Sequence, residues 1–399
     1  MLDKKVREDF PLLSKQRIVY MDNACTTLKP KQVIAAVNDY YENYSGCAGR
    51  SAHRIARKTD AMVEENRKKV ASFVNANPAG IMWTRNATEA LNWIAGGVKL
   101  EKGKDVVTSM MEHHSVILPF RRMAEKNGSR FSMVEVNRDG TSEIGHFTNA
   151  IGKNTGLVVI HDTNNSASTS APIREITKLA HENGALVVID AAQSVPHRRF
   201  DFKAVGCDFA VFSGHKMCGP TGIGVLVASE KGLAGMQRQN VGGGTVEAVS
   251  AESHVWLQGP QSYEAGIQDY AGIAGLGAAA DYLKRIGIEK IETHEHELMQ
   301  KLLPELASIV GVKVVGTTDT KKRGGIVAFN IGMTPPQEAA VMLDEMSGIA
   351  TRAGTYCAQP AMEFMGAGKG AIRASLYLYN TAEEVQTLVE TVKKVASLH

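Results

Sequence analysis

The chain has 399 residues, of which 44% are hydrophobic and 22% are charged, a composition typical of folded globular proteins rather than disordered ones. A formal net charge of +3 gives no reason to expect nucleic acid or an anionic membrane as a partner. The five cysteines are odd in number and widely scattered, which argues against a disulfide framework and for a reducing compartment. No apolar run approaches the roughly 18 residues that span a bilayer, and the first residues lack a secretory signal, so we expect a cytoplasmic protein.

Between residues 80 and 228, short apolar runs rich in Val and Ile alternate with longer amphipathic stretches. The strand-like runs cover residues 80–84, 105–109, 156–162, 185–190, 209–214 and 222–228, and helix-like stretches cover 88–98, 115–128 and 172–184. Continuously apolar strands are typical of a sheet that is buried on both faces. The alternation predicts an α/β fold with a mainly parallel sheet and right-handed crossovers.

The pattern changes after about residue 260. Helix-like stretches at 271–287, 288–311, 336–348 and 381–398 are interleaved with strand-like runs at 312–316, 325–331 and 371–377. We therefore predict a large α/β domain over residues 20–260 and a smaller α+β domain formed by residues 1–19 and 261–399. Residues 239–266 are rich in glycine and are predicted to form an irregular junction, a common place for ligand sites.

Asp190 and Lys216 are the most informative pair of residues, because each lies where an apolar strand ends. Ligands of open α/β sheets bind beyond the carboxyl ends of the strands, so both side chains are expected at one crevice. A structural ion pair is the alternative for an aspartate and a lysine taken at random. The small-residue loop GPTGIG after the lysine favours a large planar ligand instead. Pyridoxal 5'-phosphate (PLP) needs such a pair: a lysine that binds its aldehyde and an aspartate that keeps its pyridine nitrogen protonated.

A phosphate site is the second requirement of this cofactor. Residues 84–97 predict a helix that begins near Asn86 or Thr88, where backbone N–H groups and the helix dipole favour an anion. An ordinary N-cap is the alternative, and it is the commoner case when nothing else points to a ligand. Ser213 and His215, beside the lysine, add side-chain donors to the predicted phosphate site.

Seven short motifs occur in the order YMDNACTT, MEHHSV, VVIDAAQSVPH, SGHKMCGPTGIGVL, YEAG, RAGTYCAQP and IRASLYLYNT. In sequence and in order they resemble the motifs of the Suf-type (group II) cysteine desulfurases, which include selenocysteine lyases. These proteins belong to the class V aminotransferase family of fold-type I PLP enzymes. The resemblance covers nearly the whole chain, from about residue 18 to 393, and implies the fold of that family: a large, mainly parallel-sheet domain with a smaller α+β domain.

The resemblance implies roles for individual residues. Lys216 would bind the cofactor and move protons at the substrate α-carbon, and Asp190 would pair with the pyridine nitrogen. His113 would stack on the pyridine ring, and Gln193 would contact the phenolic oxygen. The residues expected to bind the cofactor are Lys216, Asp190, Gln193, His113, Thr88, Ala87, Ser213, His215 and Asn165.

The resemblance also implies a substrate-binding group formed by Arg373, Asn165 and Arg352. A planar guanidinium suits a carboxylate because it forms two parallel hydrogen bonds, so Arg373 with Asn165 would receive the substrate carboxylate. A surface charge is the alternative for Arg373, but the apolar residues on both sides of it argue against a solvated strand.

The histidine pair at His113 lacks a third ligand and is a weak metal signal, so we expect no metal.

Cys357 is the residue on which the predicted activity depends. A PLP lyase or transaminase needs no thiol, whereas in a desulfurase a thiolate attacks the substrate sulfur and leaves alanine and a protein persulfide. The position of Cys357 in RAGTYCAQP matches the nucleophile of the family. A buried, inert cysteine is the alternative; it suits Cys207 but not Cys357, which lies in a glycine-containing turn among polar residues. Arg352 is near enough in sequence to activate the thiol if its side chain points that way.

Several positions near the expected pocket depart from the family pattern. Two histidines usually precede the nucleophile, where this chain has Thr355 and Tyr356. Cys25 replaces an alanine close to the expected substrate pocket, and Cys47 lies near another altered segment. These departures leave the PLP assignment intact and leave the substrate preference and the roles of the two extra cysteines open.

The phosphate site departs from the pattern as well. The usual Gly-Thr-Thr reads Asn86-Ala87-Thr88, and Ile267 replaces a threonine that usually reaches the phosphate of the partner subunit. We expect backbone amides to compensate for the missing hydroxyl groups.

The leading hypothesis is a homodimeric, PLP-dependent cysteine desulfurase that converts L-cysteine to L-alanine and forms a persulfide on Cys357. Its sulfur would pass to an acceptor protein for the assembly of iron–sulfur clusters or another thio-cofactor. One alternative is another class V PLP enzyme without persulfide chemistry: a selenocysteine lyase, an amino-acid lyase or a transaminase. The alternative from a different class is a non-catalytic scaffold protein with the same fold.

Overall fold

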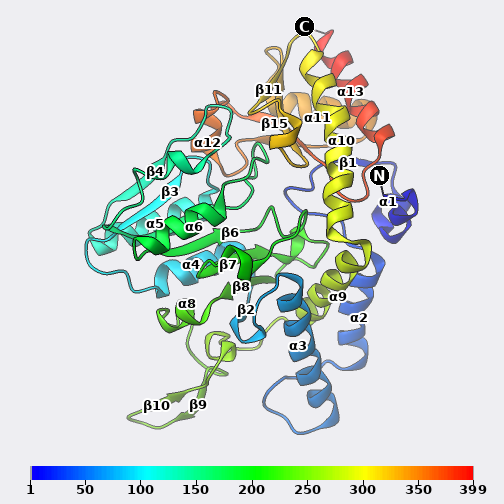
Figure 1. Ribbon diagram of the computed structural model, residues 1–399. Coiled ribbons are helices and arrows are strands. Elements are labelled where there is room, and N and C mark those ends of the chain that lie inside the picture. Colours follow the sequence, from blue (N-terminus) through cyan, green and yellow to red (C-terminus); the bar gives the residue numbers. More distant parts are fainter. Residues whose placement is uncertain (1, 399) are drawn as a thin grey trace.

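A seven-stranded sheet forms the centre of the computed structural model, which describes residues 2–398 (Figure 1). Its strands lie in the order β2-β8-β7-β6-β5-β3-β4. Their bounds are β2 (Ile81–Thr84), β3 (Asp105–Ser109), β4 (Phe131–Val134), β5 (Thr155–His161), β6 (Leu186–Asp190), β7 (Phe209–Ser213) and β8 (Gly224–Ala228). Neighbours from β7 to β4 are parallel, whereas β8 is antiparallel to both β7 and β2. The mainly parallel sheet is therefore confirmed; the runs at 80–84 and 222–228 are its antiparallel members, and β4 was not predicted.

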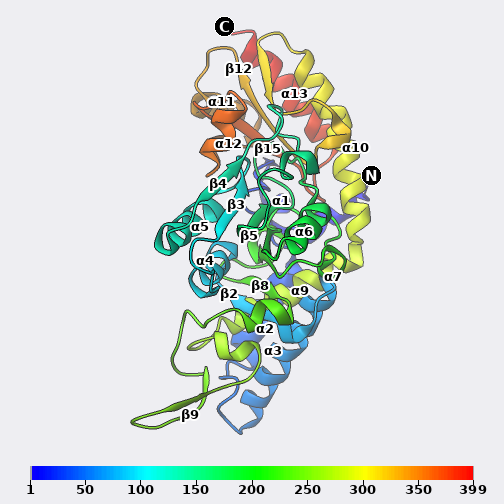
Figure 2. The same cartoon turned by 60° about the vertical axis from the view of Figure 1, so that its left-hand side comes forward.

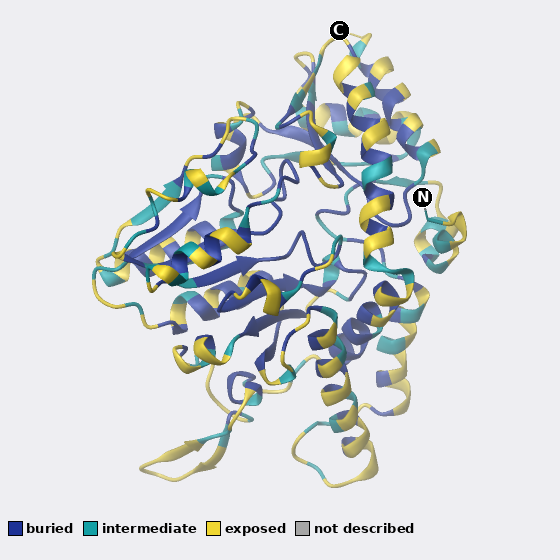
Figure 3. Cartoon of the chain, viewed as in Figure 1, coloured by how far each residue is buried: buried dark blue, intermediate teal, exposed yellow. Residues whose placement is uncertain are grey.

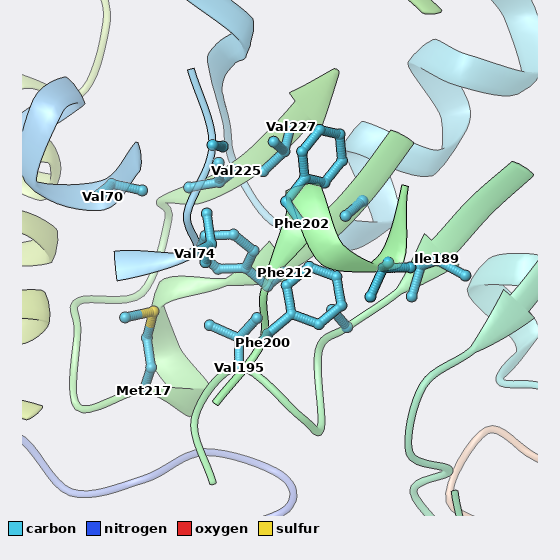
Figure 4. Close-up of a cluster of buried hydrophobic side chains, with 14 of the residues drawn as sticks. Val70, Val74, Ile189, Val195, Phe200, Phe202, Phe212, Met217, Val225 and Val227 are labelled. Atoms are coloured by element: carbon cyan, nitrogen blue, oxygen red, sulfur yellow. The ribbon is translucent and has the colours of Figure 1, made fainter. Parts of the chain in front are cut away.

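Both faces of this sheet are buried, as the continuously apolar runs predict. Every residue of β2, β3, β7 and β8 is buried. On one face, side chains of neighbouring strands such as Ile189, Phe212 and Val225 pack against Phe200 and Val74 from the loops beside the sheet (Figure 4). The helices that follow β2, β3 and β5 are α4 (Ala87–Gly97), α5 (His114–Asn127) and α6 (Ile173–Glu182), close to the three predicted stretches.

A layer of three long helices lies at the antiparallel end of the sheet. It consists of α2 (Lys31–Asn43), α3 (Arg54–Phe73) and α9 (Tyr270–Ile286) (Figure 1). Small residues allow α9 to approach α3 closely, because a Cβ on Gly277 would lie 1.7 Å from the side-chain oxygen of Asn66. The helix α9 was predicted, whereas α2 and α3 were not.

The second sheet has four antiparallel strands in the order β11-β12-β15-β14. Its strands are β11 (Val312–Val315), β12 (Ile326–Ile331), β15 (Ala371–Ser375) and β14 (Arg352–Gly354), and they pack with α10 (Ile288–Ser308), α11 (Pro336–Ser347) and α13 (Ala382–Ala396). The chain's beginning joins this part, because β1 (Val19–Tyr20) pairs with β13 (Ile349–Ala350). The two-domain division at residue 260 stays a prediction; α9 lies after that boundary and packs on helices that lie before it.

The glycine-rich junction differs from its prediction. It contains a β-hairpin of β9 (Val246–Val249) and β10 (His254–Trp256), although the sequence predicted an irregular segment. The hairpin projects from the body in two views and is mostly exposed (Figures 2 and 3). Its strands pack on no core face, so the alternation of buried and exposed residues that usually reveals a strand is absent. Among residues 2–398, no helix is both long and apolar enough to cross a bilayer.

One buried ion pair ties α3, β2 and the end of the junction together. The two terminal nitrogens of Arg67 donate to the two carboxylate oxygens of Glu264 at 2.8 and 2.9 Å, and the amide of Trp83 donates to the same carboxylate at 2.9 Å. Both side chains are almost fully buried. The glutamate of the YEAG motif is therefore part of the framework rather than of the site.

Replacing this carboxylate is expected to destabilise the fold strongly. Glu264→Gln leaves the buried Arg67 charge without its counter-charge, so we expect the free energy of unfolding to fall by about 3 kcal/mol. Urea denaturation measures this loss. The matched control is Glu64→Gln, which removes a half-exposed carboxylate 3.4 Å from the same arginine and should cost less than about 1 kcal/mol. Equal losses in the two variants would contradict the prediction.

Candidate active site at the carboxyl ends of the strands

Four parallel strands end at one cavity of about 240 Å³. β5 ends in His161, β6 ends in Asp190, and these two residues are register partners on neighbouring strands. β7 ends in Ser213, three residues before Lys216, and β3 leads into the loop that carries His113. Every residue predicted to bind the cofactor or the substrate, and Cys357 as well, lines this cavity. The strand-end rule therefore brings these residues to one cavity, and the second sheet supplies its opposite wall.

The lysine and the aspartate lie on the inner side of the cavity. Oδ1 of Asp190 accepts a hydrogen bond from the amide of Ala192 at 3.0 Å. Burial raises the pKa of Asp190, although Lys216 and the Ala192 amide oppose the rise. Burial lowers the pKa of Lys216, against the attraction of Asp190. A lysine with a lowered pKa more readily supplies the neutral amine that attacks an aldehyde.

A buried histidine and glutamate support the aspartate, and the sequence analysis missed both. Nδ1 of His161 lies 2.7 Å from Oε1 of Glu112, and its backbone amide donates to Oε2 at 3.0 Å. Burial lowers the pKa of His161, but Glu112, Asp190 and Asp162 outweigh it and raise the pKa overall. The positive charge that this favours beside Asp190 lowers the pKa of the aspartate, whereas the Glu112 carboxylate raises it. His161 ends GLVVIH as Asp190 ends LVVID, so the same strand-end signal could have found it.

His113 caps α5 with its own ring. Nδ1 accepts from the amide of Ser115 at 3.1 Å, so the neutral imidazole carries its proton on Nε2. Burial, with help from the charges of Lys216 and neighbouring groups, lowers the pKa of His113 to about 3. The ring is therefore uncharged at neutral pH, as stacking against an electron-poor pyridine ring requires.

These neutral histidines make the stability of the cofactor-free protein depend on pH. The folded pKa is about 3 for His113 and, mainly because of burial, about 4 for His215, whereas an unfolded histidine titrates near 6.5. Between these values the unfolded chain binds more protons than the folded chain, so this contribution to stability is lost as pH falls from about 6.5.

Between pH 7 and pH 5, the free energy of unfolding should therefore fall less in His113→Asn than in the unchanged protein. The expected difference between the two falls is about 1 to 2 kcal/mol. Urea denaturation of the cofactor-free protein at the two pH values measures the difference. His254→Asn, in the exposed hairpin, is the control and should not alter the pH dependence. Parallel pH profiles for His113→Asn and the unchanged protein would argue against a buried neutral ring.

The first turn of α4 forms the predicted phosphate end of the cavity. Asn86 is the N-cap, and its side-chain oxygen accepts from the amide of Glu89 at 2.9 Å. The amide of Ala87 donates to Oγ of Ser213 at 2.9 Å, which joins the helix to the end of β7. A Cβ on Gly224 would lie 2.5 Å from the backbone of Asn86, so only glycine lets α4 begin this close to the sheet. Thr88 lies beside this turn, and its hydroxyl is 2.7 Å from that of Ser115.

Arg373 lies on β15, in the opposite wall, and is 3% exposed. One terminal nitrogen donates to the backbone carbonyl of Asn165 at 3.0 Å, and the other lies 3.5 Å from Oδ1 of Asp22. The guanidinium sits over the ring of Tyr356, 4.7 Å from its centre. Tyr356, which stands where the family has a histidine, is thus a buried support for this arginine. The side-chain amide of Asn165 donates to the carbonyl of Tyr356 at 2.8 Å, so it holds the loop before Cys357.

The loop that carries Cys357 is fixed by hydrogen bonds while its thiol is exposed. The backbone carbonyl of Cys357 accepts from the amide of His114 at 2.7 Å, and the ring of His114 accepts from the amide of Gln359 at 3.2 Å. Tyr356 and Cys357 both adopt left-handed backbone conformations, with φ of 57° and 56°, which L side chains rarely take. The chain therefore turns sharply here and presents a thiol at the mouth of the cavity.

The departures from the family pattern fall in different places. Nη1 of Arg352 lies 3.9 Å from the sulfur of Cys25, a contact that the sequence analysis did not consider. Cys25 lines the cavity, whereas Cys47 and Ile267 do not. Ile267 is 66% exposed and lies outside the cavity.

The residues present fit PLP. The side-chain oxygen of Gln193 is buried without a hydrogen-bond partner, and so is Nε of Arg373. Each atom therefore lacks the partner that a bound cofactor or substrate would supply. Together with the amine, the carboxylate and the N-terminus of α4, these atoms provide complementary groups for an aldehyde, a pyridine nitrogen, a phosphate and a carboxylate.

Comparisons with known proteins show which family and which solved structures the chain is similar to. The family model for aminotransferase class-V matches residues 19–388. A curated protein named probable cysteine desulfurase, from Methanothermobacter thermautotrophicus, is 38% identical over 401 residues, which cover 100% of this chain and 99% of that protein. The solved structure of a cysteine desulfurase from Thermococcus onnurineus NA1 has a TM-score of 0.96 at 35% identity and covers 100% of this chain and 99% of its own.

A more distant structure shares the fold alone. It is a protein named C-DES, solved with glycine covalently linked to its PLP cofactor, and it is 21% identical with a TM-score of 0.85. The match covers 98% of this chain and 99% of that one.

Proposed function

Because this chain belongs to the aminotransferase class-V family, we propose that it is a PLP-dependent cysteine desulfurase that converts L-cysteine to L-alanine and holds the sulfur as a persulfide on Cys357. The observation that carries this proposal is the convergence of four groups on one cavity: the Lys216 amine, the Asp190 carboxylate, the Arg373 guanidinium and the exposed Cys357 thiol. The full-length relatives named cysteine desulfurase support the same activity.

The cofactor is PLP, held by the residues at the strand ends. Bound PLP withdraws electrons from the α-carbon of an amino acid and so labilises the bonds around it. Lys216 would hold it covalently, Asp190 would pair with its ring nitrogen, and the first turn of α4 with Ser213 and His215 would receive its phosphate. Neutral His113 would cover one face of the ring.

The protein's own residues position the substrate and move its protons. Arg373 would bind the substrate carboxylate, with Tyr356 beneath the guanidinium and Asp22 beside it. Because burial lowers the pKa of Lys216, its amine is suited to take the proton from the α-carbon and return one later. In this proposal the substrate would lie between the lysine and the thiol.

Cys357 would carry out the sulfur transfer. Its thiolate attacks the sulfur of the bound cysteine, an S–S bond forms, and the C–S bond breaks with its electron pair left on the former β-carbon. That carbon takes up a proton, so one cysteine and one thiol give one alanine and one persulfide. Cys207 and Cys218 do not fit this role, because burial raises the pKa of both thiols, that of Cys218 to about 12.

The exposure of Cys357 also fits transfer of its sulfur to another protein. A persulfide at the mouth of the cavity is accessible to the thiol of an acceptor protein, and we propose iron–sulfur cluster or thio-cofactor assembly as the destination. We also propose that the protein is a homodimer and that it works in the cytoplasm. The five cysteines of the chain are all unpaired, which suits a reducing compartment.

Measurement of the products formed from L-cysteine tests the proposal. A desulfurase forms alanine in step with the sulfur removed, whereas a lyase of the same family forms an α-keto acid and ammonia. Alanine that matches the sulfur supports the proposal, and pyruvate without alanine would favour the lyase. A protein that binds no PLP and forms neither product would favour the scaffold.

Replacing Arg373 with lysine should weaken the binding of L-cysteine more than it slows the reaction of the bound substrate. Arg373→Lys replaces a planar fork with a point charge, so we expect the KM for L-cysteine to rise on the order of 10- to 100-fold, with a smaller change in kcat. Steady-state alanine formation at several cysteine concentrations measures both constants. A fall in kcat with an unchanged KM would place the substrate carboxylate elsewhere.

A further inference from the structure

A second thiol faces the same cavity as Cys357. Cys25 lines the cavity, and the segment around it is held in place by hydrogen bonds. The amide of Cys25 donates to the carbonyl of Asp22 at 3.1 Å, and the preceding carbonyl, of Ala24, accepts from the side chain of Gln193 at 2.8 Å. The thiol is therefore part of a fixed wall, and the mechanism above leaves it without a task.

The surroundings of Cys25 suit sulfur chemistry. Nη1 of Arg352 lies 3.9 Å from its sulfur and places a positive charge beside it. Arg352 begins the strand β14 that leads to Cys357, so one short segment carries both the nucleophile and the cation beside the second thiol. Negative charge on the sulfur of Cys25 or of Cys357 raises the pKa of the Lys216 amine. Both thiols are therefore near enough to this amine to affect its charge. None of the other three cysteines lines this cavity.

We propose that Cys25 is a second sulfur carrier, which takes the terminal sulfur from the Cys357 persulfide inside the cavity. The proposal rests on the desulfurase function proposed above. The Cys25 thiolate attacks the terminal sulfur, a new S–S bond forms at Cys25, and the old S–S bond breaks with its electron pair on Cys357, which takes up the proton. One thiol and one persulfide give one persulfide and one thiol, so no oxidant or reductant is needed.

The geometry favours transfer of the terminal sulfur. In a persulfide that atom stands about 2 Å beyond the sulfur of Cys357, and Cys357 and Cys25 line the same cavity. The guanidinium of Arg352 lies beside the sulfur that accepts the transfer. After transfer, Cys357 is a free thiol again and can accept sulfur from a second cysteine before any acceptor protein arrives. Each chain would then store two sulfur atoms.

Counting the first turnovers of the holoenzyme tests this storage. The enzyme is mixed with L-cysteine without acceptor protein or reductant, the initial burst of alanine is measured, and the thiols are then alkylated. Trypsin places Cys25, Cys47 and Cys357 on separate peptides, 18–31, 32–50 and 353–369, so mass spectrometry locates each added sulfur.

We expect the unchanged enzyme to form about two alanines per chain, with added sulfur on peptides 18–31 and 353–369. Cys25→Ala should form about one, with sulfur on 353–369 only, and Cys25→Ser, which keeps the size of the side chain, should behave in the same way. Cys47→Ala is the matched control and should match the unchanged enzyme, because Cys47 lies outside the cavity.

Two results would overturn the storage role while leaving the desulfurase intact. One is a burst of about one alanine with no sulfur on peptide 18–31. The other is a larger burst whose sulfur is all on peptide 353–369, as a longer chain on Cys357. A burst that is equally large in Cys25→Ala would also overturn it. If the unchanged enzyme formed no alanine at all, the desulfurase function itself would fail, and the transfer with it.

Discussion

Replacing Cys357 with serine should reduce alanine formation from L-cysteine to the background of the assay. The hydroxyl cannot accept sulfur at neutral pH, and no other exposed thiol stands at the mouth of the cavity among the residues described. We expect a loss of at least about 1,000-fold in kcat, since the nucleophile is removed while the binding groups remain. Quantitative amino-acid analysis of the reaction mixture measures the alanine.

The variant should still bind the cofactor, because Cys357 is not among the residues proposed to hold it. The visible absorbance of the purified protein checks this directly. Cys47→Ser is the control for a thiol outside the cavity and should keep full activity. Alanine formation at the normal rate by Cys357→Ser would contradict the persulfide mechanism, even if the cofactor assignment stood.

Replacing Lys216 with alanine should remove both the covalent link to the cofactor and the proton carrier at the α-carbon. We expect kcat to fall by about 10³-fold or more, because two functions are lost with one amine. The purified variant should also lose the visible absorbance of the lysine-bound cofactor. Absorbance spectra and alanine assays of the same preparation measure the two effects.

Lys216→Arg is the matched variant for this prediction. It keeps the positive charge beside Asp190, but a guanidinium cannot form the link and does not exchange protons at neutral pH. It should therefore be as inactive as the alanine variant. Normal activity in either variant would show that the amine of Lys216 does no chemistry and that the cavity works in another way.

Most of the large sheet and the location of the site could be predicted from the sequence, because both follow from one physical rule. A strand buried on both faces must be apolar, and the first polar residue after it marks the edge where ligands bind. Asp190, Ser213 and Lys216 follow this rule, and His161 follows it too, although it was overlooked. The antiparallel direction of β8 and β2 could not be predicted, since burial on both faces gives the same apolar pattern in either direction.

The parts that were missed depend on contacts distant in sequence. The helix α3 carries mostly polar residues, and the apolar stripes of α2 and α3 make sense only once α9 lies against them. The hairpin β9–β10 packs on no core face, so no periodic signal marks it. Within the site, the contact of Arg352 with Cys25 joins residues more than 300 positions apart. The sequence analysis considered only Cys357, which is near Arg352 along the chain.

A single-turnover reaction of the holoenzyme with L-cysteine tests the proposed chemistry most directly, when alanine and protein-bound sulfur are counted in the same sample. We predict alanine and protein-bound sulfur in equal amounts, with the first sulfur on the peptide 353–369 that contains Cys357. The Cys357→Ser variant should form neither. Pyruvate in place of alanine, with no sulfur on any cysteine peptide, would contradict a desulfurase that works through Cys357.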